Sequence, residues 1–350
     1  MWISGSGRRS DSEVLSLASL RRQLVFITKK AVRMAALLVM VSLVTFALIS
    51  ASPIDPLQAN AGQALGSMSQ EQREKLESYW GVGEPPARRY VNWAKDVLQG
   101  DMGTSLLYRQ PVTEVIGTKL FNSLFLLVIS WIVSGILGVV LGIAAAVFRE
   151  RWPDRLIRGY ALLTASTPAF WLALLLLLVF SVWLKLFPVG LSVPIGVEAA
   201  QVTFADRLRH AFLPALTLSI TGISSIALHT REKMIDCLES DYVLFARARG
   251  EGTWEVVRRH GLRNILIPAV TLQFASVSEI IGGSVVVEQV FSYPGLGQAA
   301  VTAGTGSDVP LLMGITMITA LVVFAGNFLA DIFYGLIDPR IRRGGAAIEE

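Results

Sequence analysis

The sequence predicts an all-α polytopic membrane protein with six transmembrane helices and with both termini on the cytoplasmic side. The first observation behind this prediction is composition, because 53% of the 350 residues are apolar and only 17% are charged, whereas soluble domains carry about 25% charged residues. The second is that the apolar residues form long uncharged runs, and a membrane-spanning helix needs about 20 such residues in succession. An ordinary water-soluble domain is therefore excluded.

Three uncharged runs predict the first three spans. They contain 21 residues at 34–54, 29 residues at 120–148 and 26 residues at 159–184. The first run is longer than the apolar core of a signal peptide, which has about 7 to 15 residues, so we expect it to be retained as a span. The third run contains Pro168, which removes a helical hydrogen bond and predicts a kink.

Three further apolar segments predict spans four to six. The segment 210–230 is rich in Thr, Ser and Gly, and small side chains allow helices to approach closely, so we expect this span to face protein more than lipid. The segment 265–291 contains two glutamates, and the segment 309–337 contains Asp331. These carboxyl groups should face protein or water, because an acidic group at the centre of the bilayer costs about 2.5 to 3.5 kcal/mol.

The distribution of Lys and Arg predicts the orientation of the six spans. The segments on the side of the N-terminus contain 21 of the 31 basic residues, the segments on the other side contain 10, and none lies inside a span. Because cytoplasmic loops are enriched in Lys and Arg, we expect the termini and the loop 230–264 to be cytoplasmic. The net charge of +4 is thus an orientation signal and gives no reason to expect a nucleic-acid partner.

The sequence lacks the common motifs of catalysis. It contains no Gly-Lys dipeptide and therefore no phosphate-binding loop, and it contains neither H-E-x-x-H nor G-x-S-x-G. Cys237 is the only cysteine and the three histidines are scattered, so neither an intrachain disulfide nor a metal site is predicted. We expect a non-catalytic chain, and a transporter built on it would need an ATPase on another subunit.

The loop 230–264 is the most informative segment. We expect a short helix that begins near Asp241 and ends at a turn made by Gly250, followed by a second short helix with Thr253 as its N-cap. Charge alone also allows a solvated basic loop at the anionic membrane surface, but two short helices separated by glycine favour docking to a partner. One stripe of the first helix is predicted to carry Tyr242, Phe245, Ala246 and Arg249.

This loop resembles the cytoplasmic "EAA" loop in the membrane subunits of bacterial ABC importers. The resemblance is closest to the permeases of the dipeptide, oligopeptide and nickel importers. Leu244 stands where the general loop has Glu, but the long spacing between Gly250 and Pro268 agrees with this subgroup. The matching positions are Asp241-Tyr242-Val243, Ala246-Arg247-Ala248-Arg249-Gly250, Leu262-Arg263-Asn264 and Pro268.

The resemblance covers nearly the whole chain from residue 30 onward, and it implies the transmembrane-domain fold of type I ABC importers. Similar pieces include Gly100 to Ser105, Ser166 to Trp171, Phe291 to Gly297 and Asp308 to Pro310. We divide the chain into a disordered cytoplasmic extension (1–30), the first transmembrane helix (31–54), an extracytoplasmic segment (55–119), a five-helix permease core (120–337) that includes the coupling loop, and a cytoplasmic tail (338–350).

What the resemblance implies is a multi-pass permease subunit in the bacterial inner membrane. Its partners would be a second, homologous permease, two ATPase subunits that bind ATP and Mg, and an extracytoplasmic solute-binding protein, while the chain itself would bind no cofactor. Peptides are the expected cargo, with nickel, a metal chelate or glutathione as alternatives. A stand-alone membrane enzyme or receptor is the competing interpretation. The residues implied in coupling to the ATPase are Asp241, Tyr242, Ala246, Ala248, Arg249, Gly250, Arg263 and Pro268.

Five residues are candidates for the translocation path or its gate. Glu279 lies near the middle of the fifth span, where binding of a cationic cargo and helix packing both remain open. For Glu288 we favour a packing role. Pro294 and Gly295 belong to a turn just outside this span, which is either a gate or an ordinary external turn, and Pro168 is either a hinge or a packing kink.

Overall fold

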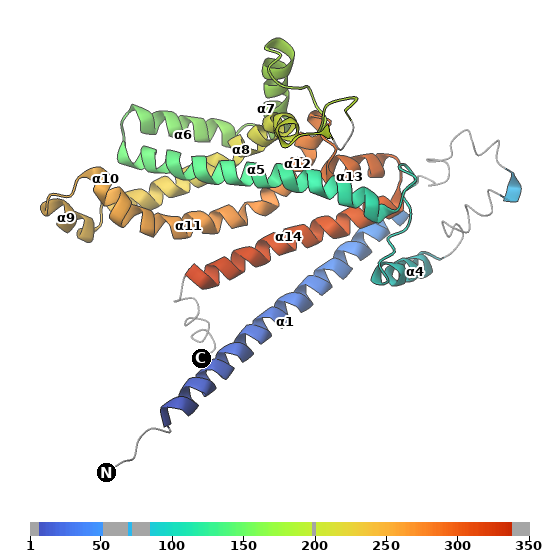
Figure 1. The fold of residues 1–350 in the computed structure, drawn as a ribbon, viewed down its shortest axis with the longest axis horizontal. Helices are drawn as coiled ribbons and strands as arrows, with labels where there is room; N and C mark the ends of the chain where they lie inside the picture. Colours follow the sequence, from blue (N-terminus) through green and yellow to red (C-terminus); the bar gives the residue numbers. More distant parts are fainter. Residues whose placement is uncertain (1–6, 52–68, 72–84, 198–200, 338–350) are drawn as a thin grey trace.

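The computed structural model describes residues 7–51, 69–71, 85–197 and 201–337. The predicted ends at 1–6 and 338–350, and most of the external segment between residues 52 and 84, lie outside these ranges. Within them the regular elements are helices (Figure 1), so the all-α prediction is confirmed. They are α1 (Gly7–Ser50), α4 (Pro86–Leu98), α5 (Val112–Val147), α6 (Trp152–Ala165), α7 (Ala169–Leu176), the π-helix η2 (Leu177–Trp183), α8 (Phe204–Leu238), α9 (Asp241–Ala248), α10 (Thr253–Val256), the π-helix η4 (Val257–Gly261), α11 (Leu262–Ala275), α12 (Val277–Val290), α13 (Leu296–Thr305) and α14 (Val309–Ile337).

The helices are long and apolar enough for up to six membrane spans. Four of them pass this test as single helices, namely residues Thr28–Ser50 of α1, all of α5, all of α8, and residues Val309–Ile332 of α14. Two bent pairs pass it together, α6 with α7 and η2, and the segment from α10 to α11 with α12. Counting each bent pair as one span gives six, which is the predicted number.

The third and fifth predicted spans are interrupted instead of continuous. α6 and α7 are separated by Ser166, Thr167 and Pro168, and their axes are bent by 108°. Pro168 is the N-cap of α7 and lacks the N–H group that would continue α6, so the predicted kink is a full break. The fifth span is bent by 45° at Ser276, between α11 and α12.

The first helix starts earlier than predicted. The composition predicts disorder for residues 1–30, but this is wrong for residues 7–30, which form the first turns of α1. The physical reason is that residues 15–24 are rich in Leu, Ala, Arg and Gln, which favour helix. At 1.5 Å per residue the helix is about 66 Å long, roughly twice the thickness of the hydrocarbon core.

α1 lies on the outside of the bundle, where it packs mainly against α14 and touches α4. Lys30 near the start of its apolar part forms an ion pair with Asp331 of α14. Toward its other end, Ser42 hydrogen-bonds to Tyr90 of α4 at 2.8 Å, and the ring of Phe46 lies against Tyr90 with 5.4 Å between the centroids. α1 is thus attached at both ends of its apolar part and is otherwise largely exposed.

The two ends of the bundle carry different elements. The beginning of α1, the end of α14 and the short helices α9 and α10 lie toward one end, which we call the α9 end (Figure 1). α4 and α13 lie toward the opposite end, which we call the α13 end.

α5 and α8 pack along each other at the centre of the bundle. A Cβ atom at Gly138 of α5 would lie 2.7 Å from the side chain of Ile226, and one at Gly142 would lie 2.6 Å from the carbonyl oxygen of Ala227. Glycine is required at both positions because the helices approach closely, as small residues allow in membranes. Among the four single-helix spans, α8 is the most buried, since 61% of the residues in its most apolar stretch lie inside the protein. This confirms that the fourth predicted span faces protein.

The variant Gly142→Ala tests this close approach. We expect it to lower the melting temperature of the detergent-purified protein, because an added methyl group in a filled contact costs about 1 to 3 kcal/mol. Gly117→Ala is the matched control, since Gly117 lies on the same helix and its Cβ would meet nothing within 4 Å. Thermal unfolding followed by tryptophan fluorescence gives the comparison, and equal melting temperatures for the two variants would contradict the α5–α8 contact.

Candidate coupling site

The chain between α8 and α11 folds into an elbow at the α9 end (Figure 1). We use the name docking elbow for residues 241–256, which comprise α9, the turn at Gly250 and α10. The predicted second short helix begins at Thr253 as α10, but it continues through η4 into α11 without a loop. Gly261, the glycine between α10 and α11, is buried against Met234, and the helix runs on through it.

The turn of the docking elbow is made by Gly250, as predicted. Its φ is +93°, a conformation that glycine adopts without steric cost. The N–H of Gly250 donates to the carbonyl of Arg247 at 2.9 Å, and the N–H of Glu251 donates to the carbonyl of Ala246 at 3.2 Å. This pair of bonds is a Schellman motif, which closes the C-terminus of α9. The N-cap of α10 is Gly252 and not Thr253, which is the first residue of that helix.

α9 packs on the end of α8 through a small apolar cluster. Val243 and Ala246 are buried against Cys237 of α8 and Val256 of α10. Of the predicted stripe of Tyr242, Phe245, Ala246 and Arg249, only Ala246 belongs to this packed face, and the other three side chains are exposed. Since α9 is only 8 residues long, two small side chains at i and i+3 suffice to seat it, and the larger ones are left outside.

A chain of polar contacts fixes the base of the docking elbow to α11. Asn264 donates from Nδ2 to Tyr242 Oη at 2.8 Å and to the carbonyl of His260 at 3.0 Å. Tyr242 Oη lies 3.1 Å from Cys237 Sγ, and His260 Nε2 lies 3.1 Å from the Glu251 carboxylate. Burial, and then the contact with Cys237, raises the pKa of the Tyr242 phenol, so the hydroxyl stays protonated and can donate to the sulfur.

Large apolar side chains project from the outer face of the docking elbow. Phe245 is 74% exposed and Trp254 is 64% exposed, and Leu244 is exposed beside them. Exposed large apolar side chains are typical of surfaces that bind another protein. Among the predicted coupling residues, Asp241, Ala248 and Arg249 are also exposed here, so the surface combines apolar and charged groups.

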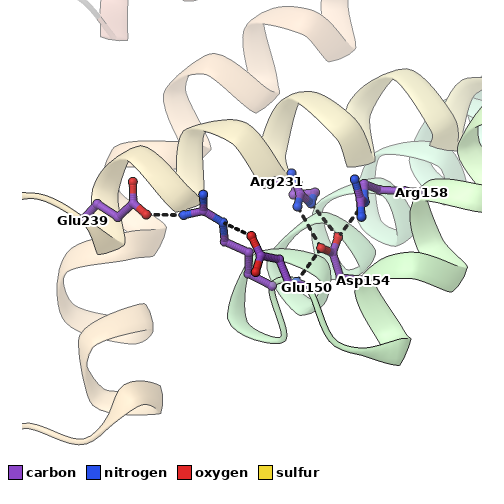
Figure 2. Close-up of polar contacts among 6 residues, drawn as sticks. Glu150, Asp154, Arg158, Arg231 and Glu239 are labelled. Carbon is purple, nitrogen blue, oxygen red and sulfur yellow. Dashed lines mark hydrogen bonds and ion pairs between the residues drawn. The ribbon is translucent and has the colours of Figure 1, made fainter.

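A buried carboxylate joins α6 to α8 next to the docking elbow. Figure 2 shows Asp154, at the start of α6, between Arg231 of α8 and Arg158. Arg231 donates to both carboxylate oxygens, from Nε at 2.6 Å and from Nη2 at 2.8 Å, and the N–H of Glu150 donates to Oδ2 at 2.9 Å. The Asp154 side chain is fully buried. Bidentate geometry fixes direction as well as distance, so α6 and α8 are held in one orientation.

A second, exposed link runs parallel to this buried one. Arg149, in the turn between α5 and α6, forms an ion pair with Glu239, the C-cap of α8. Both side chains are exposed, and ion pairs between exposed groups contribute little to stability. The buried Asp154–Arg231 pair is therefore the main polar connection between the α5–α6 turn and the last turns of α8.

The turn after α12 is held from inside by Glu288. Its carboxylate accepts hydrogen bonds from Ser123 Oγ of α5 at 2.7 Å and from the N–H of Gln298 at 3.0 Å, and the side chain is completely buried. A Cβ at Gly295 would collide with this carboxyl group. These contacts are those of the packing role that we favour for Glu288, and they place Pro294 and Gly295 in a turn packed onto α5 at the α13 end.

The remaining predicted residues lie outside residues 241–256 of the docking elbow. Arg263 is exposed in the first turn of α11, and Pro268 lies inside α11. Pro168 lies in the break between α6 and α7, and Glu279 is exposed in the first turn of α12. The structure thus gathers Asp241 to Gly250 at one surface but does not join the coupling residues with the path candidates.

Two contacts that position these sites are absent from the sequence-based prediction. They are the pairs Asp154–Arg231 and Ser123–Glu288, whose members are 77 and 165 residues apart. No local pattern reports a contact over such a distance. The sequence offers a signal only for Asp154. Trp152-Pro153-Asp154 is a typical helix start, so it predicts that Asp154 lies in the first turn of a helix, although it does not predict the partner of the carboxylate.

Comparison with protein families gives two matches along this chain. Residues 138–343 match the family described as "Binding-protein-dependent transport system inner membrane component". Residues 23–115 match the family of N-terminal regions from binding-protein-dependent transport system membrane components. The first match contains α6 to α14, and therefore the docking elbow and the Glu288 turn.

Characterised relatives are similar over nearly their full length. The oligopeptide transport system permease protein AppB of Bacillus subtilis is 34% identical over 319 residues, which cover 90% of this chain and 98% of that protein. The glutathione transport system permease protein GsiC of Salmonella typhimurium is 36% identical over 318 residues, which cover 91% of this chain and 98% of that protein.

A solved structure has the same arrangement of helices. It is an inward-facing conformation of the MetNI methionine ABC transporter, with a TM-score of 0.54 and 14% sequence identity, and the match covers 65% of this chain and 97% of the solved chain. At this identity the likeness shows the fold alone, the transmembrane fold of an ABC importer. Together with the family matches, it shows that this chain is a multi-pass inner membrane protein that belongs to the family of inner membrane components of binding-protein-dependent transport systems.

Proposed function

We propose that this chain forms the translocation path of an ATP-driven peptide importer, and that an ATPase subunit acts on it through the docking elbow. The observation that carries this proposal is the two exposed aromatic side chains, Phe245 and Trp254, on an elbow that connects α8 with α11. A solvated loop would not need a buried cluster and a Schellman motif to hold such side chains outward.

The proposed orientation puts the docking elbow in the cytoplasm, where ATP is available. The excess of Lys and Arg on that side of the spans supports this orientation. The beginning of α1 and the end of α14 lie toward the same end of the bundle (Figure 1), as an even number of spans requires. The α13 end would then face outward and receive cargo from a solute-binding protein.

The proposed assembly contains this chain, a second homologous permease and two ATPase subunits that bind ATP and Mg. No cofactor is assigned to this chain. Peptides are the proposed cargo, which the names of the relatives support, since one is an oligopeptide permease and another a glutathione permease, and glutathione is itself a tripeptide. Ligand binding by the solute-binding protein encoded nearest to this gene would test the cargo class, with a nickel or metal-chelate ligand as the contradicting result.

Movement of the docking elbow would reach the membrane in two steps. The buried cluster of Val243 and Ala246 connects it to the end of α8. The Asp154–Arg231 pair then connects α8 to α6, which is the first half of the broken third span. We propose that α6, α8 and the docking elbow move as one body, and that the break at Pro168 absorbs the change in direction. Such a two-state element is what an ATPase cycle can bias.

Substitution of Phe245 tests the docking surface. In mild detergent the wild-type chain should retain an ATPase subunit, and Phe245→Asp should lose it, because removal of a central aromatic contact weakens binding by about 2 kcal/mol or more, roughly 30-fold. Leu98→Asp is the matched control, since Leu98 is 88% exposed on α4 at the opposite end. A wild-type chain that retains no ATPase would favour a stand-alone protein, and retention by Phe245→Asp would place the docking surface elsewhere.

Gly250→Val tests the turn of the docking elbow. A β-branched residue is strongly strained at a φ of +93°, so we expect uptake of peptide into cells to be abolished while membrane insertion is normal. Gly252→Val is the control, because Gly252 has a φ of −75° and a Cβ there meets nothing within 4 Å. Normal uptake by Gly250→Val would show that the turn does not transmit movement.

The variant Asp154→Asn tests the connection between α6 and α8. It leaves Arg231 without a carboxylate, and loss of one partner of a buried ion pair costs about 3 kcal/mol or more, so the melting temperature should fall. We also expect more ATP to be hydrolysed for each peptide imported into proteoliposomes. Glu239→Gln removes only the exposed link and should leave both quantities near the wild-type values. Tight coupling in Asp154→Asn would contradict the proposed route.

A further inference from the structure

Glu279 differs from the other acidic residues in the predicted spans. Glu288 accepts hydrogen bonds from Ser123 and from the backbone, and Asp331 forms an ion pair with Lys30. Among the residues that the structure describes, Glu279 forms neither a hydrogen bond nor an ion pair, and its side chain is exposed on α12. Its carboxylate is therefore not compensated by the described part of this chain.

An uncompensated carboxylate near the middle of a span does not face lipid. Ionisable groups in membrane helices face the protein interior or a water-filled cavity, because hydrocarbon offers no hydrogen bonds or counter-charge. The chain has surfaces that suit lipid, such as the face of α5 that exposes Val128, Ile132 and Ile136. The face of α12 around Glu279 differs from it, because it carries small and polar residues.

Small and polar residues surround Glu279 on the exposed face of α12. Gly282, one turn after Glu279 on α12, is exposed, and a Cβ there would meet nothing within 4 Å. Ala275, the last residue of α11 just before the bend, is exposed as well. Ser278 lies beside Asn327 of α14, with 3.5 Å between Oγ and Oδ1, and Asn327 is exposed as well. This face presents carboxylate, hydroxyl and amide groups beside small residues, which suits contact with water. The exposed large apolar side chain on α12 is Val286, one turn beyond Gly282.

The backbone beside Glu279 is also interrupted. The fifth span bends by 45° at Ser276, three residues before Glu279. In membrane transporters, discontinuous helices near the middle of the bilayer commonly border the site through which cargo passes. The bend and the uncompensated carboxylate therefore point to the same location.

From these observations we infer that Glu279 faces the water-filled translocation path and makes it selective for cationic groups of the cargo, such as an ammonium group of a peptide. This inference rests on the proposed function, because it assigns a specificity-determining residue to the proposed path. Glu288 has a different role, because its carboxylate is hydrogen-bonded to Ser123 and to the backbone at the start of α13.

Charged thiol reagents test this inference in membranes that contain the complete transporter. Cys237 is the only cysteine of the chain, so Cys237→Ser gives a background without thiols in this subunit. Gly282→Cys then places a thiol on the same helix face as Glu279, three residues away. The reagents are a cationic trimethylammonium and an anionic sulfonate methanethiosulfonate, and reaction is scored on the purified chain by its mass.

The expected result has two parts. Both reagents should modify Gly282→Cys, and the cationic reagent should be favoured, after correction for reaction with a free thiol. Replacing Glu279 by Gln should lower this preference by about tenfold, as expected for a charge about 6 Å away in a partly aqueous site. Glu279→Asp should keep the preference. Ala275→Cys provides a second position, just before the bend, and Ile136→Cys on α5 should stay unmodified.

Two results would overturn the inference. If neither reagent modifies Gly282→Cys or Ala275→Cys, this face is covered by lipid or by the partner permease. If both reagents react but Glu279→Gln leaves the preference unchanged, the carboxylate does not select cations. Co-purification of the ATPase is measured on the same membranes, so that its loss counts against the proposed function and failed labelling counts against the path assignment.

Discussion

The close contact between α5 and α8 determines where the other core helices lie. Gly138 and Gly142 allow the backbones to approach, and the remaining helices are arranged around this pair. α6, α7, α11 and α12 pack on α8, while α13 and α14 pack on α5. The docking elbow extends from α8, and the Glu288 turn is tied to Ser123 of α5. The positions of both functional regions therefore depend on a helix contact that is possible only because Gly138 and Gly142 have no side chain.

Polar groups inside this bundle are placed so that they connect elements far apart in the sequence. Trp131 of α5 donates from Nε1 to the carbonyl of Gln273 in α11 at 2.7 Å, and Gln273 donates back to the carbonyl of Trp131. At the α13 end, Asp308 accepts from Ser105 Oγ at 2.5 Å, joining the segment before α5 to the start of α14. Hydrocarbon offers no competing partners, so such contacts specify which helices meet.

How much could be predicted from the sequence depended on whether a feature is local. Helix breaks at Pro168 and Gly250 were predictable, because the missing N–H group and the positive φ are properties of single residues. The number of spans was predictable from uncharged length. The packed face of α9 was not, since it depends on Cys237 and Val256, which lie outside that helix. The partner of Asp154 was equally hidden, because Arg231 comes from a helix 77 residues away.

The ion pair between Lys30 and Asp331 has a consequence for biosynthesis. These residues belong to the first and last spans and are 301 residues apart. Ribosomes add roughly 5 to 20 residues per second, so about 15 to 60 s pass between their synthesis. During this interval α1 lacks α14, its main packing surface, and the Lys30–Asp331 contact has not yet formed. The first helix therefore stays without its main packing partner until the last helix is made, and assembly of the bundle is completed only when that helix arrives.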